Sequence, residues 1–178
     1  MELKQIWKNP FYRFVITGVA IYTVWFFAYE MWIHPWGKLD RLVIDNLVLL
    51  SGIVLRIFGF DLIPTPPSDD PIRTIGIDGT HGLWIGDPCN GITLFALFII
   101  FVIAFPGPWK RKLWFIPVGL ISIHLINVLR IVALSIIVTY DYAYLDFNHN
   151  YTFTIVVYGF VFFLWYLWAN KFSKTKSS

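Results

Sequence analysis

Cys89, the single cysteine of the chain, lies where a polar loop meets an apolar run. Its local sequence is Asp87-Pro88-Cys89-Asn90-Gly91-Ile92, and the apolar run that follows ends at Phe105. A helix that begins at Cys89 would favour the thiolate, because the N-terminal end of a helix stabilises negative charge. A lone cysteine in a membrane protein is more often a small apolar residue of the core. Whether Cys89 is a nucleophile therefore depends on the polar residues that share its depth.

Arg130 lies inside an apolar run, near the expected outer boundary of the hydrocarbon. It is about 17 residues from Leu113, or ~25 Å along a helix axis, and a charge at such a depth is a functional hypothesis by default. Asn127, one turn earlier on the same face, could orient the guanidinium. The alternative is that Arg130 extends to lipid headgroups or pairs structurally with Asp45 or Asp87.

Four histidines compete for the role of a base. His149 lies just before the last apolar run, and His81, in the polar region before Cys89, is the second candidate. His124 lies within an apolar run and is expected to be a hydrogen-bonded core residue, and His34 is expected at the membrane interface.

A thiol, an imidazole and a guanidinium together can perform acyl transfer. The Cys89 thiolate would attack a carbonyl, His149 would act as base and then protonate the leaving amine, and Arg130 would stabilise the oxyanion. Backbone N–H groups of a helix beginning at Cys89 could add further oxyanion donors. No motif for a rival hydrolytic chemistry is present.

Composition assigns the chain to the membrane proteins. Hydrophobic residues make up 57% of the 178 residues and aromatic residues 20%, which is more apolar surface than a soluble domain of this length needs. One cysteine excludes an internal disulfide. The basic clusters are short and flank apolar runs, so membrane topology explains them better than nucleic-acid binding. No metal, nucleotide or other cofactor motif is present.

Four apolar runs are predicted to cross the bilayer as helices. They cover about residues 14–33, 89–105, 113–138 and 151–170, and the first is expected to be a retained anchor rather than a cleaved signal. The third stays apolar to about Tyr140, longer than a ~30 Å hydrocarbon core needs, so its far end should protrude or bend. The predicted fold class is an all-α polytopic membrane protein, with residues 1–178 forming a single domain.

The segment 42–60 is expected to be an amphipathic helix. Asp45, Gly52, Arg56 and Gly59 fall within a narrow arc at ~100° per residue. The helix could lie in the interface or cross with its polar stripe facing other helices. We favour the interfacial position, which gives four spans, because a crossing would give five and place the basic N-terminus outside.

Residues 61–88 form the only long non-helical region. Prolines break its first half, and the runs 72–77 and 82–86 flank Asp78-Gly79. This pattern predicts a small β-hairpin. Because unsatisfied strand edges are not tolerated in lipid, the hairpin is expected outside the hydrocarbon.

Basic clusters orient the chain by the positive-inside rule. Lys110-Arg111-Lys112 and the basic tail 171–176 are predicted to be cytoplasmic. Cys89 and the polar segment 141–150, which is expected to be a loop, would then face the opposite, extracytoplasmic side. The three residues of the proposed chemistry come from distant segments, and this topology brings them to one membrane plane.

At these residues the chain resembles the exosortase/archaeosortase family of membrane-embedded transpeptidases. Cys89-Asn90-Gly91-Ile92 is similar to the family's Cys-Ser-Gly-Ile motif, and Asn127-Val128-Leu129-Arg130 to its Asn-x-x-Arg helix. His149 follows in the expected order, although many members carry glycine four residues later, where this chain has Phe153. The resemblance covers roughly residues 38–170 and lacks the extra N-terminal spans of longer members.

The resemblance implies Cys89, Arg130 and His149 as catalytic residues, with Asn127, Asn90 and Gly91 in support and His81 as the second-choice base. It implies a cysteine transpeptidase or protease of the inner, cytoplasmic membrane, acting on its extracytoplasmic side. The substrates would be secreted proteins with a C-terminal sorting signal, made of a short motif, a transmembrane helix and a basic tail. Two alternatives stay open: a non-catalytic assembly or secretion component, and a thiol-dependent lipid acyltransferase.

Overall fold

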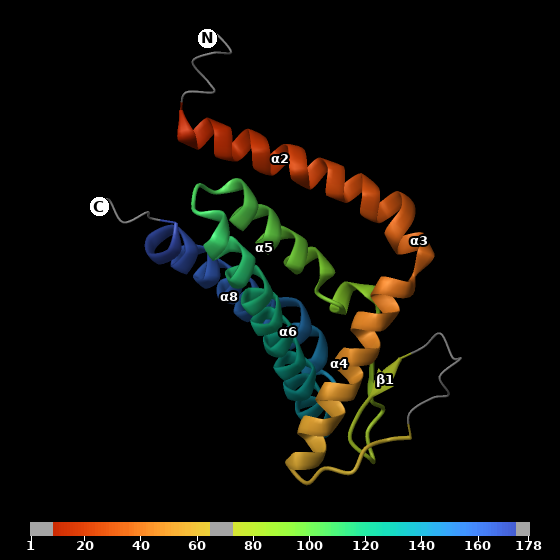
Figure 1. The fold of residues 1–178 in the computed structure, drawn as a ribbon. Coiled ribbons are helices and arrows are strands. Elements are labelled where there is room, and N and C mark those ends of the chain that lie inside the picture. The colour runs from red at the N-terminus through yellow and green to blue at the C-terminus, as the bar shows by residue number, and fades with distance from the viewer. Residues whose placement is uncertain (1–8, 65–72, 174–178) are drawn as a thin grey trace. The chain divides into compact units, whose positions relative to one another are not determined.

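The computed structural model describes residues 9–64 and 73–173, which divide into two compact units (Figure 1). Unit 1 comprises the described residues of Met1–Trp36, Ile92–Ser122 and Gly159–Ser178, and unit 2 those of Gly37–Gly91 and Ile123–Tyr158. The N-terminal lysines, the predicted strand residue Ile72 and the tail beyond residue 173 lie outside the described residues.

Three helical segments are long and apolar enough to cross a membrane, within the described part of the chain. They are Pro10–Trp36, Trp109–Tyr140 and Tyr144–Phe172. The fourth predicted span is helix α5 (Ile92–Ala104), which has 13 residues and is therefore only ~20 Å long, short of a ~30 Å core. The all-α membrane class is thus supported, and three of the four predicted spans have the length to cross.

Unit 1 packs helix α2 (Pro10–Ala28) along α5 (Figure 1). Asn9 caps α2 by accepting a hydrogen bond from Phe11 N at 2.9 Å, and the chain continues through the π-helical turn η1 (Tyr29–Ile33) into α3 (His34–Trp36). Phe14 meets the ring of Phe101 edge to face at a centroid distance of 5.4 Å, a favoured aromatic geometry.

A buried lysine closes the C-terminal end of α5 within unit 1. Lys112, near the start of helix α6 (Trp109–Tyr140), is 4% exposed. Its Nζ donates to the carbonyl oxygens of Ile103 and Phe105, both at 2.8 Å, and lies 4.7 Å from the Trp109 ring centroid. The cation therefore satisfies carbonyls that the helix end leaves without partners.

Unit 2 is built on helix α4 (Lys38–Ile57) and the second half of α6. One stripe of α4 is buried, at the spacing of an amphipathic helix: Asp40, Ile44, Leu47, Ser51, Gly52 and Leu55. Ser51 Oγ donates to the carbonyl of Val128 on α6 at 3.5 Å. The amphipathic prediction is confirmed, and α4 is not among the helices long and apolar enough to span.

The C-terminal end of α4 stops three residues before the predicted bound. Gly59 has φ +84°, its N–H reaches Arg56 O at 2.9 Å, and Phe60 N reaches Leu55 O at 3.1 Å. This is a Schellman motif, which ends a helix at a glycine in the left-handed conformation. The predicted polar stripe is only partly exposed, because Gly52 is buried while Asp45 and Arg56 face outward.

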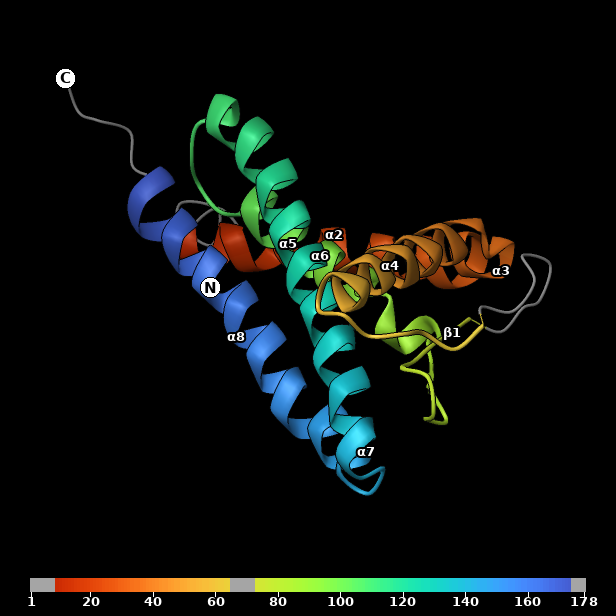
Figure 2. The ribbon, with the colours of Figure 1, turned by 90° about the horizontal axis from the view of Figure 1, so that it is seen from below.

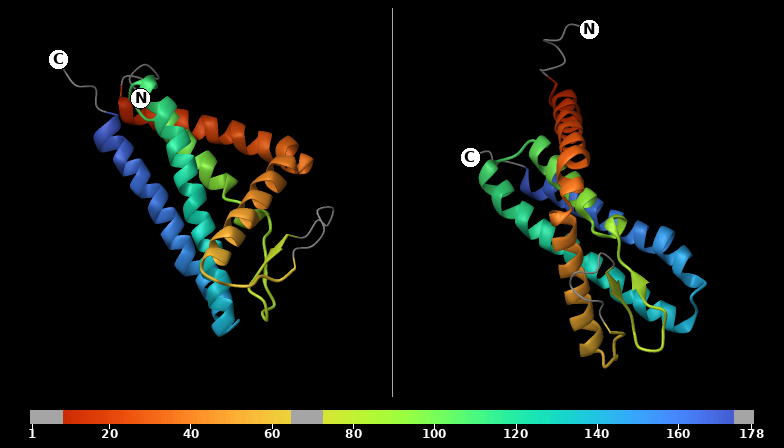
Figure 3. Two further views of the ribbon diagram at one scale, coloured as in Figure 1. Left: turned by 60° about the horizontal axis from the view of Figure 1, so that its bottom comes forward. Right: turned by 90° about the vertical axis from the view of Figure 1, so that its right-hand side faces the viewer.

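The predicted hairpin is present and lies beside α4 (Figure 3). Strand β1 (Thr74–Ile75) pairs antiparallel with β2 (Leu83–Trp84), with Ile75 opposite Leu83. Ile75, Leu83 and Ile85 are each at most 5% exposed and join the core formed with α4 and α6. The hairpin is thus packed against the helices of unit 2 on one face.

The predicted polar loop 141–150 is largely helical, and this expectation was wrong. Helix α7 (Tyr144–Phe147) passes through the π-helical turn η3 (Asn148–Thr152) into α8 (Phe153–Leu167), and Figure 2 shows α7 following the end of α6. Asp141 Oδ1 accepts from Ala143 N at 2.8 Å, a turn that ends one helix and starts the next. The polar residues here mark a helix start rather than a loop.

Candidate active site

Cys89 lies in a 3-10 turn, η2 (Asp87–Cys89), and not on the helix that follows. Cys89 N donates to Gly86 O at 2.9 Å and Asn90 N to Asp87 O at 3.1 Å, while α5 begins only at Ile92. The expectation that the thiol opens a helix was therefore wrong. Backbone N–H groups at this helix start were expected as oxyanion donors, but those of Cys89 and Asn90 already donate within the turn.

Gly91 and Asn127 together fix the backbone that carries the thiol. Asn127 is 1% exposed, and its Nδ2 donates to the carbonyl of Cys89 at 2.7 Å. Gly91 has φ +78°, and a Cβ built there would lie 3.2 Å from Asn127 Nδ2. Glycine is required for both the left-handed backbone and the close approach. Asn127 thus holds the cysteine backbone, whereas the sequence suggested that it orients Arg130.

The side chain of Asn90 is hydrogen-bonded to a buried carboxylate. Its Nδ2 donates to Asp40 Oδ1 at 2.6 Å, and both residues are 3% exposed. Asp40 lies in the first turn of α4, where an acidic side chain is also expected for helix stability alone. Asp40 was not predicted as a site residue, because an acidic residue in the first turn of a helix is common without any functional role.

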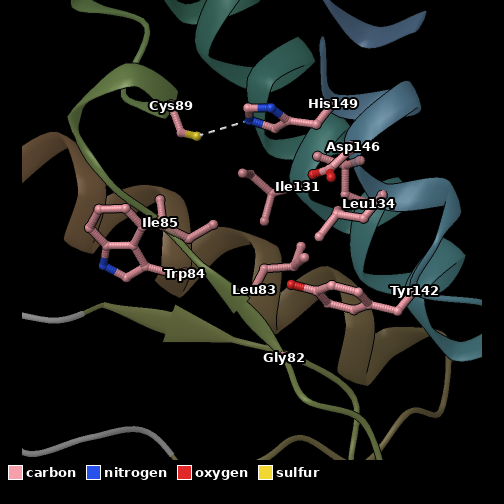
Figure 4. A pocket seen from close by; sticks show the side chains of 11 residues that line it. Gly82, Leu83, Trp84, Ile85, Cys89, Ile131, Leu134, Tyr142, Asp146 and His149 are labelled. Carbon is pink, nitrogen blue, oxygen red and sulfur yellow. Dashed lines mark hydrogen bonds between the residues drawn. The ribbon is translucent and has the colours of Figure 1, made fainter. Parts of the chain in front are cut away.

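His149 contacts the thiol directly, as the close-up in Figure 4 shows. Its Nε2 lies 3.3 Å from Cys89 Sγ, and its Nδ1 lies 3.3 Å from Asn150 Oδ1. The Asn150 side-chain oxygen only accepts, so this contact favours the tautomer that carries its proton on Nδ1, in which Nε2 can accept from the thiol. The π-helical turn η3 carries the imidazole, and such turns are frequent at functional sites.

Arg130 joins the same cluster through the backbone of His149. Its Nη2 donates to His149 O at 3.3 Å, and Thr154 Oγ1 donates to the same carbonyl at 3.1 Å. Arg130 Nε is buried without a hydrogen-bond partner in the described residues. The alternative of a structural pair with Asp45 was wrong, because that carboxylate pairs with Arg73.

The surroundings of Cys89 keep its thiol protonated. Burial raises the thiol pKa above its ordinary value of 9.0, while the nearby Arg130 charge and the hydrogen bond to the Gly86 backbone lower it less. Loss of hydration disfavours the charged form more than these two groups favour it. The resting thiol is therefore favoured in its neutral, protonated form.

A cavity of about 220 Å³ opens beside the thiol within unit 2. Cys89 and His149 are among its lining residues, and Figure 4 shows their side chains pointing toward one another. The remaining lining is mostly apolar: Gly82, Leu83, Trp84, Ile85, Ile131, Leu134, Tyr142, Leu145 and Asp146. Sequence analysis missed Tyr142 and Asp146 because the segment that carries them was expected to be a loop.

Neither His81 nor His124 lines this cavity. His81 is exposed, and its ring meets Tyr142 edge to face at a centroid distance of 6.2 Å. His124 Nε2 lies 2.7 Å from Asn46 Oδ1, so its predicted hydrogen bond is confirmed, but the residue is half-buried rather than part of the core. In residues 9–64 and 73–173, no group of three or more His, Cys, Asp or Glu side chains is placed to hold a metal ion.

Comparisons of the chain with protein-family models, with curated proteins and with solved structures gave no match. The site is therefore interpreted from its own geometry, to which the motif resemblance adds an expectation about substrates.

Proposed function

We propose that this protein is a membrane-embedded cysteine transpeptidase or protease. The observation that carries the proposal is the 3.3 Å contact between Cys89 Sγ and His149 Nε2. Arg130 is bonded to the same histidine, and a cavity opens onto the thiol. A nucleophile within hydrogen-bond reach of a base, with a fixed cation beside it, is the arrangement that covalent acyl transfer requires.

The reaction begins with proton transfer from the Cys89 thiol to the His149 imidazole. As Cys89 Sγ attacks a substrate carbonyl carbon, its proton passes to His149 Nε2, and the C=O electron pair moves onto oxygen. The two nearby amides of the 3-10 turn already donate hydrogen bonds within the turn. Arg130 is therefore the group that stabilises this oxyanion. Collapse re-forms the carbonyl and breaks the C–N bond, and the leaving amine takes the proton from the imidazolium.

The product of this half-reaction is a thioester on Cys89. An incoming amine or water loses a proton to His149 and attacks the thioester carbonyl, and the thiolate that leaves recovers the proton. An amine acceptor makes the enzyme a transpeptidase, and water makes it a protease. Both outcomes use the same three residues.

The resemblance supplies the proposed substrate and location. The substrates are secreted proteins whose C-terminal sorting signal contains a transmembrane helix and a basic tail. The positive-inside rule supports an extracytoplasmic position for Cys89, and the resemblance supports the cytoplasmic membrane as the location. A substrate anchored by one helix would present its signal at this membrane surface.

The test compares variants in the native host. Cys89→Ala and His149→Ala are expected to abolish the shortening of surface proteins that carry such a C-terminus. His81→Ala, an exposed histidine outside the thiol contact, is the matched control and should process normally. Unchanged surface proteins in Cys89→Ala would overturn the proposal and favour a non-catalytic component. An acyl chain rather than a polypeptide trapped on Cys89 would favour the lipid acyltransferase.

A further inference from the structure

Strand β2 meets the cavity along its edge rather than with one face. Four consecutive residues, 82–85, line the cavity. Successive side chains of a strand point to opposite faces, so one face alone would contribute only every second residue. The backbone of β2 therefore borders the space that opens onto Cys89.

The hydrogen-bond ladder leaves the backbone of Trp84 directed away from β1. Ile85 N donates to Arg73 O at 2.8 Å, and the register pairs Thr74 with Trp84. Hydrogen-bonded and non-hydrogen-bonded pairs alternate in an antiparallel ladder, so Trp84 belongs to a non-hydrogen-bonded pair. Its N–H and C=O point to the open edge of β2, and no bond to another described residue satisfies them there.

We infer that β2 binds the substrate polypeptide as an added strand. The inference rests on the proposed function and specifies how the segment beside the scissile bond is held. An unpaired N–H and C=O at the edge of an apolar cavity match a peptide backbone, which supplies one acceptor and one donor. A lipid acyl chain supplies neither group and would leave both unsatisfied.

The cavity walls define what such a strand would carry. Leu83 and Ile85 are buried against the helices, so an added strand would direct alternate side chains toward the same apolar layer, which includes Ile131 and Leu134. The other side chains would lie on the face where Trp84 is 69% exposed. The substrate segment is therefore extended, with apolar residues at every second position. The chain leads from Ile85 straight into the turn that holds Cys89, which aligns the bound segment with the thiol.

The test removes the N–H of Trp84 without touching the ladder. Trp84→Pro deletes that donor, and proline is tolerated where a strand N–H faces outward. Trp84→Ala is the matched control, because it removes the same side chain and keeps the N–H. Processing of a host protein that depends on Cys89 should be about tenfold slower in Trp84→Pro than in Trp84→Ala. Alkylation of Cys89 by iodoacetamide should proceed at similar rates in both variants.

Equal processing by the two variants, with processing still lost in Cys89→Ala, would overturn the added strand and leave the proposed function standing. If Cys89→Ala changes no host protein, both proposals fail.

A second measurement serves if Trp84→Pro does not fold. Trp84→Cys in the Cys89→Ala background is oxidised with single cysteines placed along the substrate segment. Disulfide yields that rise at every second residue support the strand, and yields without this alternation overturn it.

Discussion

Replacing Gly91 by alanine should damage the site more than the same change at Gly79. The two glycines have φ values of +78° and +82°, so alanine costs each a similar ~1–2 kcal/mol for the left-handed backbone. Their surroundings differ, because a Cβ at Gly79 meets nothing within 4 Å and one at Gly91 lies 3.2 Å from Asn127 Nδ2. Any difference between the variants therefore reports the contact with Asn127.

The size of that difference follows from the bond that Asn127 makes. Its Nδ2 donates to Cys89 O at 2.7 Å, and the side chain is 1% exposed, so it has little room to retreat from a new methyl group. A broken bond that leaves a buried carbonyl unsatisfied costs ~1–3 kcal/mol. Gly91→Ala should lose ~2–5 kcal/mol in total, against ~1–2 kcal/mol for Gly79→Ala.

Thermal unfolding and alkylation measure the two consequences. A chain of this size loses about 2–4 °C in Tm per kcal/mol, so Gly91→Ala should melt several degrees below Gly79→Ala. Cys89 is the only cysteine, which makes alkylation by iodoacetamide specific to the site. Its rate should change in Gly91→Ala and not in Gly79→Ala.

A double-mutant cycle decides whether Asn127 transmits the effect. In an Asn127→Ala background the bond is already absent, so adding Gly91→Ala should cost no more than the backbone term. Equal Tm losses for Gly91→Ala and Gly79→Ala in the wild-type background would refute the reasoning. Gly91 would then serve the turn alone.

Three further predictions concern charge. The alkylation rate of Cys89 should rise with pH to a midpoint above 9.0, because burial raises the thiol pKa; Arg130→Gln should move the midpoint higher and Arg130→Lys should restore it. The folded state favours the protonated thiol, so the contribution of Cys89 to stability is complete below the thiol pKa of the unfolded chain. That contribution is lost as pH rises through the thiol pKa of the folded protein. A Tm series from pH 8 to 11 should therefore show a larger loss for the wild-type protein than for Cys89→Ala. Lys112→Met should cost ~2–3 kcal/mol, because two carbonyls lose a charged donor, while Lys110→Met, at an exposed position, should leave Tm nearly unchanged.

Sequence patterns predicted the elements whose periodicity is strong. The apolar runs became helices, the alternating runs around Asp78-Gly79 became a hairpin, and segment 42–60 became an amphipathic helix. The boundaries of helices were predicted less accurately where hydrogen bonds from side chains determine them. Asp141 and Asp146 indicated a loop by polarity, yet one caps a turn and the other lies in the first turn of α7.

The sequence identified the candidate site residues but did not predict most of the contacts that they make. Cys89, Arg130 and His149 were expected near one plane, and the structure brings them into one cluster. The partners of the supporting residues depend on packing between segments far apart in sequence. Asn127 reaches the backbone of Cys89 across 38 positions, and Asp40 reaches Asn90 across 50, so no local pattern contains either bond.

The protonated thiol also changes how Cys89 would act as the proposed nucleophile. A helix N-terminus would have supplied a standing thiolate, but the 3-10 turn uses its amides internally, and burial opposes charge on sulfur. In the proposed reaction the 3.3 Å contact with His149 is then necessary, because the thiol proton must leave as the carbon–sulfur bond forms. In the proposed reaction Arg130 stabilises the negative charge that develops on sulfur as the proton leaves, and then the charge on the carbonyl oxygen. Its charge therefore acts on the transition state more than on the resting thiol. Removing Arg130 should therefore slow processing far more than it slows alkylation, in which no oxyanion forms.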